Sequence, residues 1–242
     1  MDKKKIIEII RNAGIIGAGG AGFPTYMKLN ANVDTIIING AECEPLLYKD
    51  KEVMRLYPEE MVSGLNIAME LTGAKTGIIA LKAKNKEAIP KLQEISKKYK
   101  GIRVEIIPDV YPSGDEVVLV YEVTKRIVPP AGIPLQVGCV VSNSETFINI
   151  HRAVKNNEAV IYKYLTITGE VKKPITIKVP VGVRIKDILS FAGGVTVSDP
   201  VFIDGGPMMG SVVFDENTPV SKTSAGYIVL SKQHPLIIRK NS

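Results

Sequence analysis

The stretch TIIINGAECEP, residues 35–45, opens with the apolar run that determines the fold. A short continuous run of this kind indicates a strand buried inside a sheet, and TGIIALK (76–82) and VEIIP (104–108) have the same character. Between these runs, residues 58–72 and 85–99 carry apolar side chains at helical spacing. Strand–helix–strand–helix–strand of this length predicts an α/β layer with parallel strand pairs.

The same alternation extends on either side of this central part. Residues 4–13 are expected to form a short amphipathic helix. Another helix is expected to begin at YPSGDE (111–116), and GCVVSN (138–143) is expected to be a strand. The helix predicted over 144–154 follows an asparagine and begins with a serine, and both residue types cap helix N-termini.

The pattern changes near residue 160. Strands with alternating apolar residues come next, followed by one helix that a glycine stops and by further short strands. These strands are expected at 164–171, 175–180, 200–204, 211–214 and 226–230, and the helix at 183–194. The sequence therefore predicts an α/β domain over residues 1–160 and a smaller α+β domain over residues 161–242.

Composition narrows the functional classes. The 242 residues are 45% hydrophobic and 23% charged, as in a globular protein, and the longest apolar runs are far too short to span a bilayer. The N-terminal segment lacks the apolar centre of a signal peptide, so a cytoplasmic protein is expected. The formal charge of +6 comes from scattered lysines without an aromatic strip, which favours a solvated basic surface over nucleic-acid binding. Only two cysteines, Cys43 and Cys139, are present, whereas an iron–sulfur cluster normally needs four thiolates, so no metal site is expected.

The motif GAGGAG, residues 17–22, matches the dinucleotide-binding pattern G-x-G-x-x-G letter for letter. That pattern requires a strand before the glycines, whereas a helix is expected here, so a regular Rossmann interpretation fails. The physical property that remains is a loop without side-chain bulk, whose backbone N–H groups can form an anion-binding nest. A flexible turn without a ligand explains the loop alone equally well.

Polar residues also gather at other expected junctions between strands and helices. Asn39, Glu42 and Glu44 follow the first strand, and YPSGDE (111–116) and SNSET (142–146) lie between an apolar strand and a helix. In an open α/β sheet ligands bind beyond the carboxyl ends of the strands, so these junctions could meet in one crevice. A solvated acidic loop is the alternative for the two glutamates.

Five segments in this order resemble the RnfC family of electron-transport subunits, whose relatives include PduS-type cobalamin reductases. They are GIIGAGGAGFPTYMKL, INGAECEPLLYKDKEVM, YPSGDE, VPPAGIPLQVGCVVSNSETFINIHRAV and IDGGPMMGS, and together they cover nearly the whole chain. More distantly, the chain is similar to the flavin- and NADH-binding subunit of respiratory complex I. The resemblance implies a Rossmann-like FMN-binding α/β domain followed by a small β-grasp domain of the SLBB type.

The resemblance also implies which residues hold FMN. Gly17, Gly19, Gly20 and Gly22 would line the flavin phosphate and ring, with Lys28 near the phosphate or ribityl chain; Asn39, Glu42 and Glu44 would flank the isoalloxazine; Tyr111, Gly114 and Glu116 would form another wall; and Asn143 and Thr146 would close the ribityl-phosphate side. No side chain is expected to act as a catalytic acid or base, because the flavin carries the chemistry.

Two differences from the flavin-binding protein of complex I bear on the electron donor. In that protein the glycine loop continues with a sequence like GFPTGLKWSF, whereas this chain has GFPTYMKLNA. Of the aromatic residues, Phe23 is therefore retained, and Tyr26 is its possible companion. The complex I protein also has one more acid after the asparagine, where this chain has Gly40 and Ala41. These differences predict a weak response to NADH, although NAD(H) stays a possible donor, and they leave the prediction of FMN unchanged.

The resemblance further implies partners. Proteins of the RnfC type continue into a ferredoxin module with two [4Fe–4S] clusters, which is expected either in a continuation of this chain or on a separate polypeptide. The expected function is electron transfer through FMN between NADH or ferredoxin and iron–sulfur carriers. Partners would be ferredoxin-like proteins or membrane electron-transport subunits, with peripheral attachment to the inner face of the membrane possible through them. A PduS-type cobalamin reductase and a non-redox ligand-binding or scaffold module are the alternatives.

Overall fold

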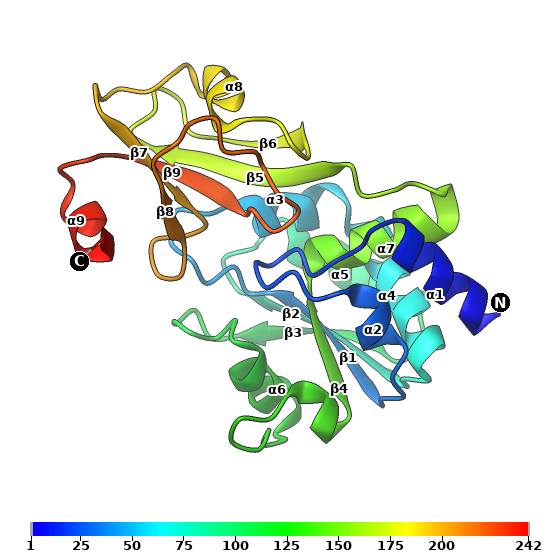
Figure 1. The fold of residues 1–242 in the computed structure, drawn as a ribbon. Helices are drawn as coiled ribbons and strands as arrows, with labels where there is room; N and C mark the ends of the chain where they lie inside the picture. Colours follow the sequence, from blue (N-terminus) through cyan, green and yellow to red (C-terminus); the bar gives the residue numbers. More distant parts are fainter. Residues whose placement is uncertain (1, 242) are drawn as a thin grey trace. The chain divides into compact units, whose positions relative to one another are not determined.

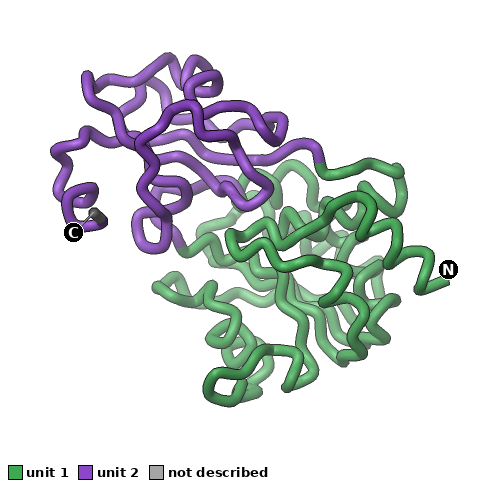
Figure 2. The backbone as a smooth tube through the Cα atoms, viewed as in Figure 1, with its two compact units in different colours: residues 1–43, 50–160 green, residues 44–49, 161–242 purple. Residues whose placement is uncertain are grey.

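The computed structural model describes residues 2–241, which divide into two compact units (Figure 2). Unit 1 consists of residues 1–43 and 50–160, and unit 2 of residues 44–49 and 161–242. Residues 44–49, here called the strap, were assigned to the first domain by the sequence, but their contacts group them with unit 2.

Unit 1 is built on a four-stranded parallel sheet in the order β3-β2-β1-β4 (Figure 1). The strands are β1 (Thr35–Gly40), β2 (Thr76–Lys82), β3 (Ile102–Ile107) and β4 (Cys139–Asn143). The predicted strands and their parallel pairing are therefore confirmed. Successive residues of β1 are fully buried from Ile36 to Ile38, which explains why the strand is a continuous apolar run.

Helices cover both faces of this sheet (Figure 1). α6 (Glu116–Thr124) packs on one face, where its Leu119 and Val120 join Ile37, Ile78 and Val141 in one apolar cluster. The other face is covered by α4 (Pro58–Thr72) and α7 (Ser144–Asn156), which pack closely on each other. Their contact is close because a Cβ atom at Gly64 of α4 would overlap the backbone carbonyl of Phe147 in α7.

Five further helices lie in the described part of unit 1, two predicted with slightly different bounds and three not named in advance. α1 (Lys3–Asn12) precedes the glycine loop as expected, and α5 (Ala88–Ser96) is shorter than the predicted helix. α2 (Thr25–Leu29), α3 (Lys49–Leu56) and the 3₁₀ helix η1 (Pro134–Val137) complete the unit. None of the helices in residues 2–241 combines the length and the hydropathy that a bilayer span needs.

Unit 2 is a five-stranded mixed sheet in the order β6-β5-β9-β7-β8 that grips a short helix. Only β5 and β9 pair in parallel, and the other pairs are antiparallel. Its elements are β5 (Tyr162–Gly169), β6 (Ile175–Pro180), α8 (Ile185–Leu189), the 3₁₀ helix η2 (Ser190–Ala192), β7 (Pro200–Asp204), β8 (Ser211–Val213), β9 (Gly226–Ser231) and α9 (Pro235–Asn241). The buried side of α8 packs into the same core as Leu165, Phe202 and Tyr227, which is the β-grasp arrangement that the resemblance implied.

The single helix predicted over 183–194 is wrong in its extent. The α-helix ends at Leu189, and the next turn is the 3₁₀ helix η2, closed by Gly193 at a φ of +76°. The periodicity continues through this turn because Ala192 still faces the core while Phe191 is exposed. Apolar spacing alone therefore did not distinguish an α-helix from an α-helix followed by a 3₁₀ turn.

Candidate functional site

The order of the sheet in unit 1 creates one topological switch point. From β1 the chain moves outward through β2 to β3, and then returns to place β4 on the other side of β1. Asn39 in β1 is the register partner of Asn143 in β4, so the carboxyl ends of the two central strands lie side by side. Ligands of open α/β sheets bind at such a point, because the connections diverge there and leave a crevice.

The glycine loop is fastened over this switch point. A bridge between Ile16 and Pro24 closes the loop, and the N–H of Gly17 donates to the carbonyl of Phe23 at 2.9 Å. The N–H of Ala18 donates to the buried Oγ1 of Thr146 in α7 at 3.1 Å. A Cβ at Gly19 would lie 3.3 Å from the Cβ of Asn143, so the loop packs directly against the residue that ends β4.

The tip of the glycine loop leaves space for a ligand to lie directly against its backbone. Gly20 has a φ of +115°, and a Cβ built there has no atom within 4 Å, so a side chain would enter open space beside the loop. Asn143 caps the adjoining helix α7, its side chain accepting from the N–H of Glu145 at 3.1 Å. A bare backbone loop beside the start of a 13-residue helix fits the phosphate end of a flavin mononucleotide.

Lys28 connects the loop to the rest of this edge. Its Nζ donates to the carbonyl of Val141 in β4 at 2.9 Å, and it lies 3.6 Å from a carboxylate oxygen of Glu116 at the start of α6. The same ammonium group is 5.8 Å from the centre of the Phe23 ring. The structure thus brings together three side chains that the sequence had named separately.

The segment 111–116 lies against the end of β1. The side-chain amide of Asn39 donates to the carbonyl of Gly114 at 2.7 Å, and its oxygen accepts from the N–H of Ala41 at 3.2 Å. The N–H of Gly114 points to the Sγ of Cys43 at 2.9 Å. Asn39 and Gly114 therefore hold this wall of the site together through their own contacts, while Tyr111 is half-exposed beside them.

The two glutamates of the acidic segment have partners within the chain. The carboxylate of Glu42 accepts from the N–H groups of Asp50 at 2.7 Å and of Lys51 at 3.1 Å, which caps α3 from eight and nine residues upstream. The carboxylate of Glu44 accepts from the N–H groups of Met208 and Met209 in unit 2 at 2.9 and 2.8 Å. Their direct contact with the isoalloxazine stays a prediction, as do the roles of the other named residues at the flavin.

Asp50 is a residue of this site that sequence reasoning missed. It is buried, and its carboxylate accepts from the side-chain amide of Asn143, at 3.0 Å to each oxygen, and from the hydroxyl of Ser144 at 2.6 Å. The signal in the sequence was an acid in the first turn of a helix, which marks a helix start. Asp50 orients the side chain of Asn143, against which the glycine loop packs.

The charged residues around the end of β2, at the same edge of the sheet, form ion pairs. Lys82, at the end of β2, is buried with its Nζ 2.9 Å from the carboxylate of Asp109, and Lys84 is 3.2 Å from the same oxygen. The hydrogen bond from Lys82 lowers the pKa of Asp109, so this acid is ionised at neutral pH. Elsewhere in the unit, burial raises the pKa of the Cys139 thiol, so this cysteine is an inert core residue.

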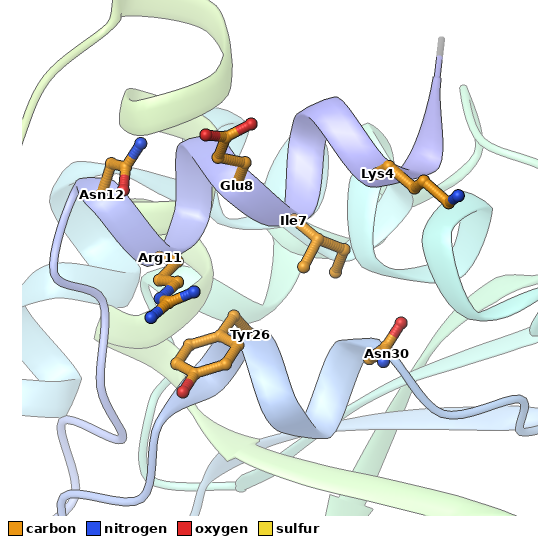
Figure 3. A pocket seen from close by; sticks show the side chains of 7 residues that line it. All are labelled: Lys4, Ile7, Glu8, Arg11, Asn12, Tyr26 and Asn30. Atoms are coloured by element: carbon orange, nitrogen blue, oxygen red, sulfur yellow. The ribbon is translucent and has the colours of Figure 1, made fainter.

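A pocket of about 390 Å³ lies between α1 and α2 and includes none of the predicted flavin residues (Figure 3). Lys4, Ile7, Glu8, Arg11, Asn12, Tyr26 and Asn30 line it. The Arg11 guanidinium lies 5.6 Å from the centre of the Tyr26 ring. Tyr26, considered from the sequence as a companion to Phe23, is thus a neighbour of Arg11 in this pocket.

Comparison with known proteins agrees with this geometry. Residues 164–212 match the SLBB domain. Cobalamin reductase PduS from Citrobacter freundii is 49% identical over 239 residues, which are 99% of this chain and 52% of that protein. A component of the proton-translocating ferredoxin:NAD(+) oxidoreductase complex from Clostridium ljungdahlii is 36% identical over 236 residues, 95% of this chain and 51% of that protein. The chain therefore spans about half the length of these relatives.

A solved structure shares the fold. The crystal structure of NAD+-reducing [NiFe]-hydrogenase in the H2-reduced state matches with a TM-score of 0.80 and 22% identity, covering 96% of this chain and 47% of that one. Residues 10–152, which contain the whole parallel sheet and the glycine loop, match the family described as the Nuo51 FMN-binding domain. The chain belongs to the Nuo51 FMN-binding domain family.

Proposed function

We propose that this chain is the flavin-binding module of an RnfC-like oxidoreductase and holds FMN at the carboxyl edge of its parallel sheet. When bound, the flavin accepts a pair of electrons from a reduced donor and passes them on singly to iron–sulfur carriers. The observation that carries the proposal is the attachment of the glycine loop to the β1–β4 switch point, through Ala18 to Thr146 and through Gly19 to Asn143.

The chain's own residues position the cofactor in this proposal. The loop 17–22 offers backbone N–H groups and space to the phosphate, next to the start of α7. Lys28 places a positive charge beside the loop, and Glu116, 3.6 Å away, limits where that charge can move. Asn39 and Gly114 fix the wall on which the ring system would lie.

The electron-transfer partners and the electron donor of this chain are proposed from its relatives. A ferredoxin-like protein or a membrane-bound electron-transport protein would exchange electrons with the flavin, with [4Fe–4S] clusters supplied outside this chain. Attachment to a membrane would then be peripheral, through such a protein. NADH is the candidate donor, but the retention of Phe23 without the neighbouring aromatics predicts slow reduction by NADH.

A cobalamin reductase of the PduS type is the second candidate. It is favoured by the difference in identity, 49% to the Citrobacter cobalamin reductase against 36% to the component of the Clostridium complex. The two candidates share the flavin site and differ in the acceptor. The FMN-loaded, dithionite-reduced chain should reoxidise faster with cob(III)alamin than with an oxidised two-cluster ferredoxin if the second candidate is right, and the reverse order would favour the first.

The test of flavin binding is a titration of FMN, followed by the quenching of flavin fluorescence and by calorimetry. One FMN per chain is expected, and riboflavin should bind at least about tenfold more weakly, because it lacks the phosphate that the loop would hold. Equal binding of FMN and riboflavin would remove the assigned role of the loop. Absence of binding to both would refute the proposed function.

A further inference from the structure

The strap, residues 44–49, is the feature of the chain that the flavin site does not explain. The chain leaves unit 1 after Cys43, spends six residues in unit 2 and returns to unit 1 at Asp50 (Figure 2). One boundary between the units therefore falls after β1, at Cys43–Glu44, and the other falls after the first residue of α3, at Lys49–Asp50. A loop that only had to connect β1 to α3 could lie exposed on the surface. The strap instead follows unit 2, so contacts within unit 2 must hold it there.

Three anchors hold the strap within unit 2. The carboxylate of Glu44 accepts from the N–H groups of Met208 and Met209 and fills the space that a side chain at Gly206 would need. Leu47 is buried, and its Cδ2 would lie 2.7 Å from a Cβ at Gly226.

The third anchor is a backbone contact: the N–H of Tyr48 donates to the Oγ1 of Thr166 in β5 at 3.0 Å. A side-chain carboxylate, a buried apolar side chain and a backbone N–H thus hold the strap at Glu44, Leu47 and Tyr48.

The residues at the two ends of the strap hold the flavin site. Before it, Cys43 accepts from the N–H of Gly114. After it, Asp50 accepts from Asn143 and Ser144, and the N–H of Asp50 donates back to Glu42. The distance between Cys43 and Asp50 is therefore limited by the path of six residues that are fastened elsewhere.

We propose that the strap makes unit 2 a positioning element for the flavin site, with Glu44 as its main anchor. This inference rests on the proposed function, because it names what sets the geometry of that same site. Glu44 is a positioning residue: it fixes the strap, the strap sets Cys43 and Asp50, and these orient Gly114 and Asn143. A direct contact between Glu44 and the flavin ring is the competing explanation, and it makes no demand on Leu47.

Three variants of the full chain separate these explanations. Glu44→Gln places an NH2 group where one N–H of the 208–209 loop needs an acceptor. Leu47→Ala loosens the strap by removing buried apolar atoms, without changing any charge or hydrogen bond. Tyr48→Phe is the matched control, since Tyr48 anchors the strap by its backbone and its side chain is half-exposed.

The first measurement is hydrogen exchange of the flavin-free chain, read by mass spectrometry. In Glu44→Gln the amides of Met208 and Met209 should exchange about tenfold faster, and in both strap variants the amides of Asp50, Lys51 and Gly114 should also exchange faster. The control should match the wild-type chain. Faster exchange confined to residues 206–210 would overturn the proposal, and this result does not depend on flavin.

The second measurement is FMN affinity together with the visible circular dichroism of the bound flavin. Both strap variants should bind FMN about tenfold more weakly and change the dichroism in the same direction, because both act through Asn143 and Gly114. Loss in Glu44→Gln alone would overturn the proposal in favour of direct contact, and unchanged binding in both would also overturn it.

Two controls keep the outcomes separate. If the wild-type chain binds no FMN, the proposed function fails. The hydrogen-exchange data, measured without flavin, still test whether the strap fixes the positions of Asp50 and Gly114. If Leu47→Ala does not fold, Thr166→Val takes its place, since it removes the acceptor of the Tyr48 N–H and leaves the strap unchanged in sequence.

Discussion

Replacing Gly20 by valine should weaken FMN binding without unfolding the protein. Gly20 has a φ of +115°, where a β-branched residue is strained by about 1–3 kcal/mol. In the free chain the exposed tip of the loop can relax, because a Cβ there touches nothing within 4 Å. The free energy of unfolding should therefore change by less than about 0.5 kcal/mol.

Binding should reverse that relaxation. A ligand lying against the loop requires the backbone conformation that only glycine adopts easily, and the valine side chain would occupy the same space. Strain of about 1–3 kcal/mol, paid at the moment of binding, corresponds to roughly a 5- to 150-fold rise in Kd. The assays are a fluorescence titration with FMN and urea unfolding of the free protein.

A matched control is Gly73→Val. Gly73 also has a positive φ, +76°, with nothing within 4 Å, but it ends α4 where the chain enters β2, at the amino edge of the sheet. This variant should lower the free energy of unfolding by about 1–2 kcal/mol and leave FMN affinity unchanged. The reasoning is refuted if Gly20→Val binds FMN within twofold of the wild type, or if both variants weaken binding alike.

Three other substitutions test separate parts of the molecule. Lys28→Met should reduce the ratio of FMN to riboflavin affinity by about tenfold, measured at two salt concentrations; an unchanged ratio would place Lys28 away from the phosphate. Glu42→Gln should destabilise the chain by about 0.5–2 kcal/mol in urea, because one N–H at the start of α3 loses its acceptor, whereas Glu52→Gln on the same helix should have a smaller effect. Burial raises the pKa of Asp204. The wild type should therefore lose stability relative to Asp204→Asn as pH rises from about 4 through that raised pKa. Above it, the free energies of unfolding of the two proteins should change in parallel with pH. Urea unfolding across this pH range checks the last prediction, and a wild type that gains stability relative to Asp204→Asn as pH rises would contradict it.

The parallel sheet could be predicted because its signal is local. Strands buried on both faces are continuous apolar runs, and helices of 8 to 15 residues between them leave little choice but parallel pairing. The glycine loop could be recognised for the same reason, since its composition is visible in nine residues. Its place at the switch point follows from the topology, once β4 is known to return beside β1.

The strap and the capping of α3 could not be predicted, because their partners are distant in sequence. Glu42 caps a helix that starts seven residues later, outside the range of the usual capping patterns. Glu44 bonds to residues 164 and 165 positions away, which no local pattern records. Acids after a strand therefore suggested ligand contacts, while the structure shows backbone partners for both.

The strap has a consequence for how such a chain can be divided or recombined. A crossover at residue 160 would separate the β-grasp sequence from a six-residue piece that it holds, and would leave the N–H groups of Met208 and Met209 to a foreign glutamate or to none. A successful chimera would need to inherit residues 44–49 and 161–242 from the same parent. Either unit can therefore be exchanged between related proteins only with both of its sequence segments together, and not as one consecutive block.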